Sequence, residues 1–190
     1  MKLDSGPETV RPPVALGCFF GLAVIVFIFG IAAFAIVFLE SGADTGEVSL
    51  DVSEAYAPGS VKFIGEDNIF LVRLGNGDFV ALADLDAANR TNQSRRCRVG
   101  LVPINEPVLA LSQAVLRSQM SAEAEGTTSV FYEPCLGSIY DVAGIRLNGP
   151  GMNLERHPVT LDRGGHVVVD TSTRECSERT DGATFSPSPC

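Results

Sequence analysis

The sequence predicts a mainly β protein, with one antiparallel sandwich or barrel domain that contains a single inserted helix and follows an N-terminal transmembrane helix. Short strand-like runs separated by turn residues predict the β class, and the clearest turn is Gly75-Asn76-Gly77-Asp78. An uncharged run from Val14 to Leu39 predicts the membrane helix. The length of 190 residues and the hydrophobic content of 45% fit one globular domain plus this helix.

The uncharged run is long enough to cross a bilayer, since a hydrocarbon core of about 30 Å requires about 20 helical residues. A cleaved signal peptide is the competing interpretation, but its apolar region would span only about 7–15 residues. Lys2 and Arg11 precede the run, whereas the next basic residue after it is Lys62. The positive-inside rule therefore predicts a cytoplasmic N-terminus and an extracytoplasmic domain.

Two glycines within the predicted membrane helix, Gly17 and Gly21, form a G-x-x-x-G pattern. Residues four apart lie on one face of a helix, and small residues there let a second helix approach closely. The pattern favours packing against another membrane helix, and chance spacing of two glycines is the alternative. No ionisable residue interrupts the run, so we expect an anchor and not an ion pathway.

Turn residues and composition divide the chain into five segments. We expect a cytoplasmic N-terminus (1–13), the transmembrane helix (14–39), an acidic linker (40–57), the β domain (58–171) and a flexible C-terminal tail (172–190). An apolar stripe at helical spacing predicts a helical insertion at about 106–123. The expected strands are Val61–Ile64, Ile69–Leu74, Phe79–Leu82, Ser129–Tyr132, Val159–Leu161 and His166–Asp170.

Charge and cysteine content exclude several classes of function. The net charge of −9 argues against electrostatic binding of nucleic acid or anionic lipid. No C-x-x-C pair or cluster of histidine and cysteine at zinc spacing occurs, so no structural zinc site is expected, and no small-molecule substrate is evident. Cys18 falls in the membrane helix. The external cysteines, which allow three disulfide connectivities, are Cys97, Cys135, Cys176 and Cys190.

One loop, Glu133–Asp141, resembles the second cluster-binding loop of Rieske iron–sulfur proteins. That family reads C-x-C-H-G-S-x-Y-D, and this chain reads E-P-C-L-G-S-I-Y-D. The likeness extends through Gly137–Pro150 and covers most of residues 58–171, although Gly149-Pro150-Gly151-Met152 stands where the family has G-P-A-P. The first cluster loop, C-x-H-x-x-C in the family, aligns with Asn92–Cys97. The resemblance implies a Rieske-like antiparallel β fold.

The four positions that ligate the cluster in the family carry other residues here, namely Asn92, Ser94, Glu133 and Leu136. A Rieske centre binds one iron through two cysteines and the other through two histidines. Hard oxygen donors do not suit those positions, and Leu136 has no donor atom. The resemblance therefore implies that no cofactor is bound, and the alternative is a 2Fe-2S cluster held by ligands that align differently.

The remaining cysteine of each loop is present, as Cys97 and Cys135. In the family these two cysteines form a disulfide that holds the loops together, so the resemblance implies the same bond here. Cys176 and Cys190 then remain as a second candidate pair. An extracytoplasmic location would supply the oxidising conditions that both bonds require.

The resemblance implies a non-enzymatic role, as a structural or accessory subunit of a respiratory or photosynthetic electron-transfer complex in a plasma or energy-transducing membrane. Its partners would be integral membrane subunits that contact the transmembrane helix. An active electron-transfer subunit with a 2Fe-2S centre is one alternative. A stand-alone extracytoplasmic binding module is another, in which an anion would be attracted by Arg90, Arg95, Arg96 and Arg98.

Overall fold

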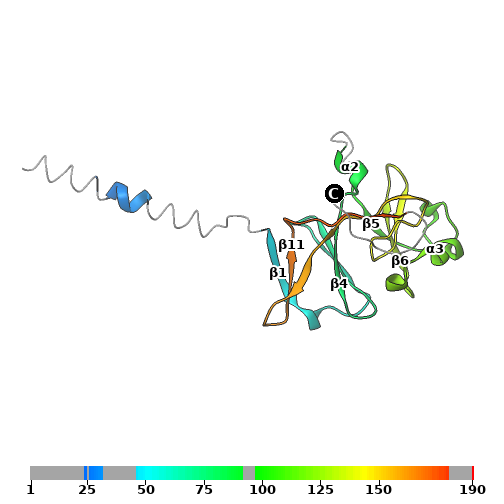
Figure 1. Ribbon diagram of the computed structural model, residues 1–190, viewed down its shortest axis with the longest axis horizontal. Coiled ribbons are helices and arrows are strands. Elements are labelled where there is room, and N and C mark those ends of the chain that lie inside the picture. Colours follow the sequence, from blue (N-terminus) through cyan, green and yellow to red (C-terminus); the bar gives the residue numbers. More distant parts are fainter. Residues whose placement is uncertain (1–23, 25, 32–45, 92–96, 180–189) are drawn as a thin grey trace, which may run out of the picture. The chain divides into compact units, whose positions relative to one another are not determined.

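The computed structural model describes residues 24, 26–31, 46–91, 97–179 and 190. The chain divides into two compact units, Met1–Thr45 and Gly46–Cys190. The second unit is mainly β, with antiparallel strand pairs and few helices (Figure 1), which confirms the predicted class. It begins at Gly46, and not at residue 58 where the sequence predicted the domain to start.

In the first unit, residue 24 and residues 26–31 are helical, and their large apolar side chains are more than half exposed. Among the described residues, no helix combines the length and the apolar character needed to cross a membrane. Most of the predicted span 14–39, including Gly17 and Gly21, lies outside the described residues. The N-terminal segment 1–13 lies outside them as well.

A four-stranded antiparallel sheet has the order β2-β3-β4-β9. Its strands are β2 (Val61–Ile64), β3 (Ile69–Arg73), β4 (Phe79–Ala83) and β9 (Arg156–His157). The turn between β3 and β4 is closed by a hydrogen bond of 2.8 Å from Leu74 N to Asp78 O. Gly77 in this turn has a φ of 96°, which glycine adopts without steric cost. The hairpin predicted from the Asn-Gly turn is confirmed.

A second sheet begins in the segment predicted as a linker. Its order is β1 (Glu47–Val52), β11 (His166–Asp170) and β10 (Val159–Leu161), and all pairs are antiparallel. The linker prediction is wrong for residues 47–52 because exposed and half-buried residues alternate there, which is the period of a strand with one packed face. A short 3₁₀ turn, η1 (Ser53–Ala55), follows β1.

The third sheet, in the order β5-β6-β7, carries the helical insertion between its first two strands. These strands are β5 (Gly100–Pro103), β6 (Ser129–Glu133) and β7 (Ser138–Tyr140). In place of one helix over 106–123, the insertion contains η2 (Pro107–Leu109), α3 (Gln113–Gln119) and η3 (Ala122–Ala124). Ala110 ends η2 in the left-handed conformation, and Ser112 begins α3 by accepting a hydrogen bond from Val115 N at 3.4 Å. The predicted apolar stripe still packs inward, because Leu109 and Leu116 are buried.

Residues 172–179 were predicted to form a flexible tail, but they pack against the domain. β12 (Glu178–Arg179) pairs with β8 (Gly151–Met152), and the backbone of Glu175 pairs with that of Arg156. The tail prediction is wrong for this segment because its backbone groups satisfy strand edges elsewhere in the domain. Residues 180–189 lie outside the described residues. One short helix, α2 (Ala87–Thr91), was also not predicted.

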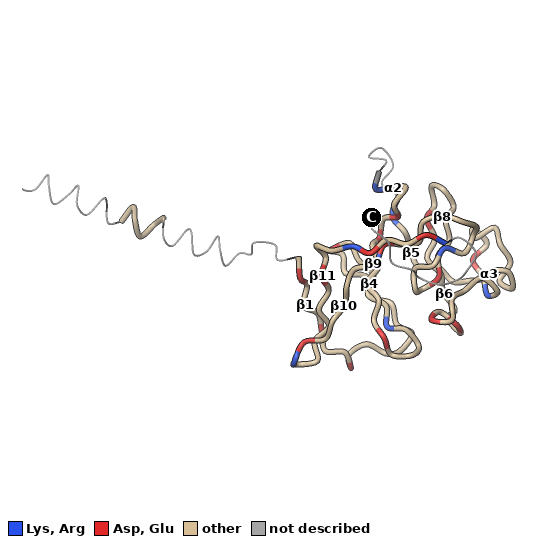
Figure 2. Tube along the Cα trace, in the orientation of Figure 1, with Lys and Arg blue, Asp and Glu red and all other residues tan. Residues whose placement is uncertain are grey.

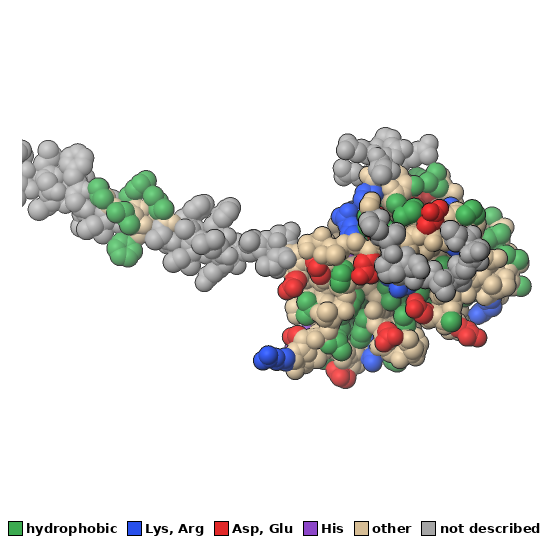
Figure 3. Space-filling view, viewed as in Figure 1, with side chains coloured by type: hydrophobic (Ala, Val, Ile, Leu, Met, Phe, Trp, Pro, Cys, Tyr) green, Lys and Arg blue, Asp and Glu red, His purple; other side chains and the backbone are tan. Residues whose placement is uncertain are grey.

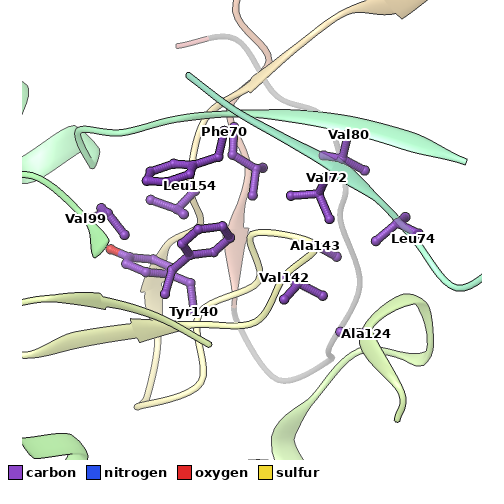
Figure 4. Packing of buried hydrophobic residues seen from close by; sticks show 12 residues of the cluster. Phe70, Val72, Leu74, Val80, Val99, Ala124, Tyr140, Val142, Ala143 and Leu154 are labelled. Carbon is purple, nitrogen blue, oxygen red and sulfur yellow. The ribbon is translucent and has the colours of Figure 1, made fainter. Parts of the chain in front are cut away.

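Three hydrophobic clusters form the core of the second unit. The first joins two sheets, since Phe70 and Val72 of β3 pack with Tyr140 of β7 (Figure 4). Phe131 of β6 belongs to the same cluster. The Phe70 and Phe131 ring centroids are 4.9 Å apart. The second cluster joins β3 and β4 to β11, and the third packs the insertion on β6 and β7. Together the first and third clusters hold β6 and β7 in place, and the turn between these two strands carries the candidate site.

Candidate functional site

A disulfide between Cys97 and Cys135 links the two loops that the sequence singled out. Cys97 precedes β5 and Cys135 lies in the turn between β6 and β7, with 6.0 Å between their Cα atoms. Cys176 and Cys190 are also bonded, with 5.1 Å between their Cα atoms. The expected Cys97–Cys135 bond is confirmed, and the second candidate pair is bonded as well. Cys135 is exposed and Cys97 is half-buried, so the first bond lies at the surface of the unit.

Glu133 ends β6 with a fully buried carboxylate that folds back onto its own loop. One carboxylate oxygen accepts a hydrogen bond from Cys135 N at 2.6 Å, and the other accepts one from Leu136 N at 2.7 Å. Gly137 N donates to Glu133 O at 3.0 Å. The side chain therefore holds the turn that carries Cys135.

Asn148 fixes the other side of the same loop. Its amide nitrogen donates to Gly137 O at 2.7 Å, and its amide oxygen accepts from Ile139 N at 3.0 Å. Gly137 has a φ of 72°, a conformation that disfavours any residue with a Cβ. The Glu133 side chain thus binds the first half of the loop from Glu133 to Ile139, and the Asn148 side chain binds the second half.

The other three positions that ligate the cluster in the Rieske family add little to this site. Leu136 is 51% exposed and presents an alkyl side chain at the surface. Asn92 and Ser94 lie outside the described residues. The second loop therefore offers one carboxylate and one hydrocarbon at the two positions where the family has a cysteine and a histidine.

The described arginines near these loops are engaged with carboxylates. Arg90 in α2 lies 2.8 Å from Glu155, and Arg98 pairs with the buried Asp84. Acidic and basic residues are likewise interspersed along the chain trace (Figure 2) and on the face of the unit shown in Figure 3. Arg95 and Arg96 lie outside the described residues. The paired arginines give little support to the anion-binding alternative.

Tyr140 connects the candidate site to α2 through a contact that sequence reasoning missed. Its hydroxyl donates to Asp86 Oδ2 at 3.0 Å, and Asp86 Oδ1 accepts from the backbone and side-chain nitrogens of Asn89 at 2.8 and 2.9 Å. Burial raises the pKa of the Tyr140 hydroxyl, and the neighbouring Asp86 charge raises that pKa further. Tyr140 therefore stays protonated and acts as a donor. The two partners are 54 residues apart, so no local pattern signals the bond.

Asp141, the last residue of the motif, forms a second buried carboxylate site. Oδ1 accepts from Ala143 N at 3.0 Å and Ile145 N at 2.9 Å. Oδ2 accepts from Ser121 N at 2.9 Å and from Ser121 Oγ at 2.7 Å. Burial raises the pKa of Asp141, and the four hydrogen bonds oppose that rise by favouring the charged form. This carboxylate attaches the insertion to the turn that follows β7.

Three potential metal ligands meet at the disulfide. The two Sγ atoms of Cys97 and Cys135 and one carboxylate oxygen of Glu133 all lie within 4.8 Å of one another. These residues do not fit a Rieske cluster, which requires two thiolates on one iron and two imidazoles on the other. Both sulfurs are bonded to each other, and Leu136 supplies no donor. We therefore derive no electron-transfer step through a cluster at this site.

A surface pocket of about 480 Å³ lies between β4, β10 and the insertion, and its lining includes Arg73 and Arg156. Both guanidinium groups support backbone there. Arg73 donates to Ser53 O at 2.8 Å and to Tyr56 O at 2.5 Å, and Arg156 donates to Ala143 O at 2.6 Å. The arginine side chains that line this pocket therefore stabilise the backbone around it. The lining does not include the disulfide or Glu133.

Comparison with known proteins gives one structural match. No family model matches the chain, and no curated protein matches it. Among solved structures, the chain is similar to a candidate NADH-dependent nitrite reductase small subunit from Mycobacterium tuberculosis, with 15% sequence identity and a TM-score of 0.34. The match covers 70% of this chain and 95% of that chain. Likeness at this level assigns neither a family nor an activity.

Proposed function

We propose that this protein is a membrane-anchored Rieske-like protein without an iron–sulfur centre, and that it serves as a structural accessory subunit of a respiratory or photosynthetic electron-transfer complex. The observation that carries the proposal is the turn at Glu133. There a carboxylate replaces a cluster cysteine of the family pattern and binds the backbone nitrogens of Cys135 and Leu136. The Glu133 side chain thereby supports the loop from within, which favours a role of this loop in shape over one in cofactor binding.

The Cys97–Cys135 disulfide, which we call the clamp, adds to this support. Selection for the fold requires the Cys97–Cys135 bond and the bracing by Asn148, whereas selection for redox chemistry requires the cluster ligands. A disulfide that spans 38 residues contributes on the order of 4 kcal/mol in the chain-entropy model. Such a contribution is a large part of the stability of a domain of this size. The elements that shape the loops are present, and the second-loop ligands are not.

The anchor is the uncharged run from Val14 to Leu39. Its described residues, 24 and 26–31, are helical and present valine, isoleucine and phenylalanine side chains on their surface. A helix that is apolar all round is typical of a segment buried in lipid or protein. We place the N-terminus in the cytoplasm and the second unit outside, with integral membrane subunits as partners along the Gly17 and Gly21 face.

Metal analysis and electron paramagnetic resonance test the absence of the cluster. Full-length protein purified anaerobically from its native membrane is expected to contain far less than two iron atoms per chain and to show no Rieske signal after reduction with dithionite. Two irons per chain together with that signal would establish the active electron-transfer subunit instead. The Glu133→Cys/Leu136→His variant restores two family ligands and serves as a probe of whether the second loop is the limiting part.

Purification from native membranes in mild detergent tests the accessory role. The wild-type chain is expected to migrate with integral membrane subunits of a redox complex, and the Gly17→Leu/Gly21→Leu variant is expected to lose them. Gly30→Leu is the matched control, because Gly30 lies in the same hydrophobic run on a different face of an ideal helix. A wild-type chain that migrates alone would contradict the accessory role and favour the stand-alone module.

A further inference from the structure

We propose that reduction of the Cys97–Cys135 disulfide creates a mononuclear binding site for a thiophilic divalent cation such as Zn²⁺, with Glu133 as the third protein ligand. The oxidised clamp and the metal-bound site are two alternative ways of joining the same loops. The inference concerns the reduced chain and does not rest on the proposed role in a membrane complex. It also differs from a Rieske centre, because it uses the two clamp cysteines and one metal ion.

The positions of the donor atoms support a single ion. The two Sγ atoms and a Glu133 carboxylate oxygen lie within 4.8 Å of one another. Zinc–sulfur bonds are about 2.3 Å and zinc–oxygen bonds about 2.0–2.2 Å, so ligand atoms in a tetrahedral site are about 3.5–3.8 Å apart. The Cα atoms of Cys97 and Cys135 are 6.0 Å apart. Rotation of the freed cysteine side chains therefore reaches the required spacing without rearrangement of β6.

Glu133 is held in place before any metal arrives. Its carboxylate is fully buried, and the nitrogens of Cys135 and Leu136 bind its two oxygens at 2.6 and 2.7 Å. A carboxylate oxygen accepts more than one interaction, so each oxygen retains a lone pair for a cation. Metal-ligating carboxylates are themselves hydrogen-bonded in this way, which orients them toward the ion. The backbone nitrogens would thus act as the supporting shell of the site.

The sulfurs become ligands only after a balanced redox step. A dithiol reductant transfers two electrons and two protons to the disulfide, so the Cys97–Cys135 bond breaks into two thiols while the reductant forms its own disulfide. Cys135 is exposed, which gives a reductant access to the bond. Binding of the divalent cation then displaces the two thiol protons to solvent, because thiolates and not thiols ligate metals.

The donor set selects a class of metal. Two thiolates favour zinc and other thiophilic cations over magnesium or calcium, which prefer all-oxygen sites. The two thiolates balance the charge of a divalent ion, and the carboxylate adds one further negative charge. These three ligands leave one position of a tetrahedral site for water or for another ligand. In the reduced chain, the ion would hold the loop before β5 and the loop after β6 together in place of the covalent bond.

Cobalt titration of the full-length protein tests the site, because tetrahedral Co²⁺ bound to thiolate has a charge-transfer absorption in the near ultraviolet. After reduction with a phosphine, which contributes no thiol, the chain is expected to bind one Co²⁺ with this absorption, and Zn²⁺ is expected to displace it. The oxidised chain is expected to show no such absorption. The Cys97→Ser/Cys135→Ser variant, which keeps Cys18, Cys176 and Cys190, is expected to lose it after the same reduction.

The Glu133→Gln variant tests the third ligand. Removal of a ligand carboxylate is expected to weaken Co²⁺ binding by roughly 10-fold or more, since even a supporting residue typically contributes about 10–100-fold. Glu66→Gln is the matched control, because Glu66 is an exposed turn residue outside the cluster, and we expect unchanged affinity. Unchanged affinity in Glu133→Gln would overturn the three-ligand site.

A separate measurement covers the case in which Glu133→Gln does not fold. X-ray absorption of the reduced wild-type chain with one bound Zn²⁺ is expected to show two sulfur ligands, with the remaining ligands oxygen or nitrogen. A shell without sulfur, or one with three or four sulfurs, would overturn the proposal. Persistence of the cobalt absorption in the Cys97→Ser/Cys135→Ser variant would overturn it too, because the signal would then come from other cysteines.

Discussion

Glu133 and Asp141 are two fully buried carboxylates at the two ends of one motif, and they are satisfied in different ways. Glu133 binds backbone nitrogens two and three residues ahead of it, so its partners lie within the same turn. Asp141 divides its four hydrogen bonds between its own turn and Ser121, twenty residues earlier in the chain. The first carboxylate shapes a loop, whereas the second attaches one part of the fold to another.

This difference separates local from long-range stabilisation within a single stretch of sequence. Loss of a local contact loosens the turn that carries Cys135, and the Cys97–Cys135 bond limits how far that turn can move. Loss of the Asp141 contacts detaches the insertion and also leaves buried donors without an acceptor. We therefore expect the two sites to respond differently to substitution, and four measurements, from the largest effect to the smallest, test this comparison.

Removal of the clamp is expected to have the largest effect. The Cys97→Ser/Cys135→Ser variant should lower the free energy of unfolding by about 4 kcal/mol, because the disulfide closes a long loop in the unfolded chain. Urea denaturation monitored by circular dichroism measures the change. Cys176→Ser/Cys190→Ser, which opens a bond of sequence separation 14, should cost about 1 kcal/mol less. An equal or larger loss in the second variant would contradict the loop-length argument.

The Asp141→Asn substitution is expected to lower the free energy of unfolding by about 3 kcal/mol. The new amide nitrogen is a donor and cannot accept the hydrogen bonds that a carboxylate oxygen accepted, so buried donors lose their acceptor. Equilibrium denaturation measures this loss. Asp162→Asn is the control, because Asp162 is exposed and its side chain accepts from Gly164 N and His166 N within a hairpin turn. We expect the control to lose less than about 1 kcal/mol. Equal losses would show that the contacts to Ser121 add nothing.

The Glu133→Gln substitution is expected to have an intermediate effect of about 1–2 kcal/mol in the oxidised protein. The amide retains one acceptor oxygen, and the neighbouring disulfide still holds the turn. The same substitution in the Cys97→Ser/Cys135→Ser background should cost more, because the clamp no longer limits movement. A double-mutant cycle measures this coupling. Additive losses would mean that the carboxylate and the disulfide stabilise the loop independently.

The smallest expected effect is a pH dependence at His157, whose Nδ1 contacts Thr173 O at 2.9 Å. Burial lowers the pKa of His157 below its usual 6.5, and the nearby Arg174 charge also lowers it. Above pH 6.5 the imidazole is neutral in both the folded and the unfolded chain. As the pH falls through 6.5, the unfolded chain binds a proton first, so stability decreases until the pH reaches the folded pKa.

Thermal or urea denaturation from pH 7.5 to pH 5 measures this contribution. The wild-type chain should lose more stability over that range than His157→Gln, which has no titrating ring. His166→Gln is a useful comparison, because His166 lies in β11 and its Nδ1 contacts Leu50 O at 3.0 Å. Identical pH profiles for wild type and His157→Gln would contradict the burial argument.

The hairpins were predictable because their signals are local. Asn76 and Gly77 set the turn between β3 and β4 by conformational preference, and short apolar runs on either side of the turn set the flanking strands. The clamp was predictable for another reason, since the motif around Cys135 resembles a known loop. β1 was missed because its acidic residues suggested a linker, and only pairing with β11 makes its alternation meaningful. The sequence predicted where the insertion lies and that its apolar residues pack inward. Its division into short helical pieces depends on the left-handed conformation of Ala110.

The sequence by itself determined the antiparallel β class, because short apolar runs and turn residues signal it locally. The pairing of Cys97 with Cys135 and the assignment of the cluster-ligand positions came from the resemblance of the two loops to the Rieske family. Only the tertiary structure decided what Glu133 and Asp141 bind. A carboxylate has several lone pairs, and its partners depend on which backbone groups the packed sheets bring within about 3 Å of it. Folding brings Ser121 to Asp141, and it brings Glu133 to the two sulfurs of the clamp.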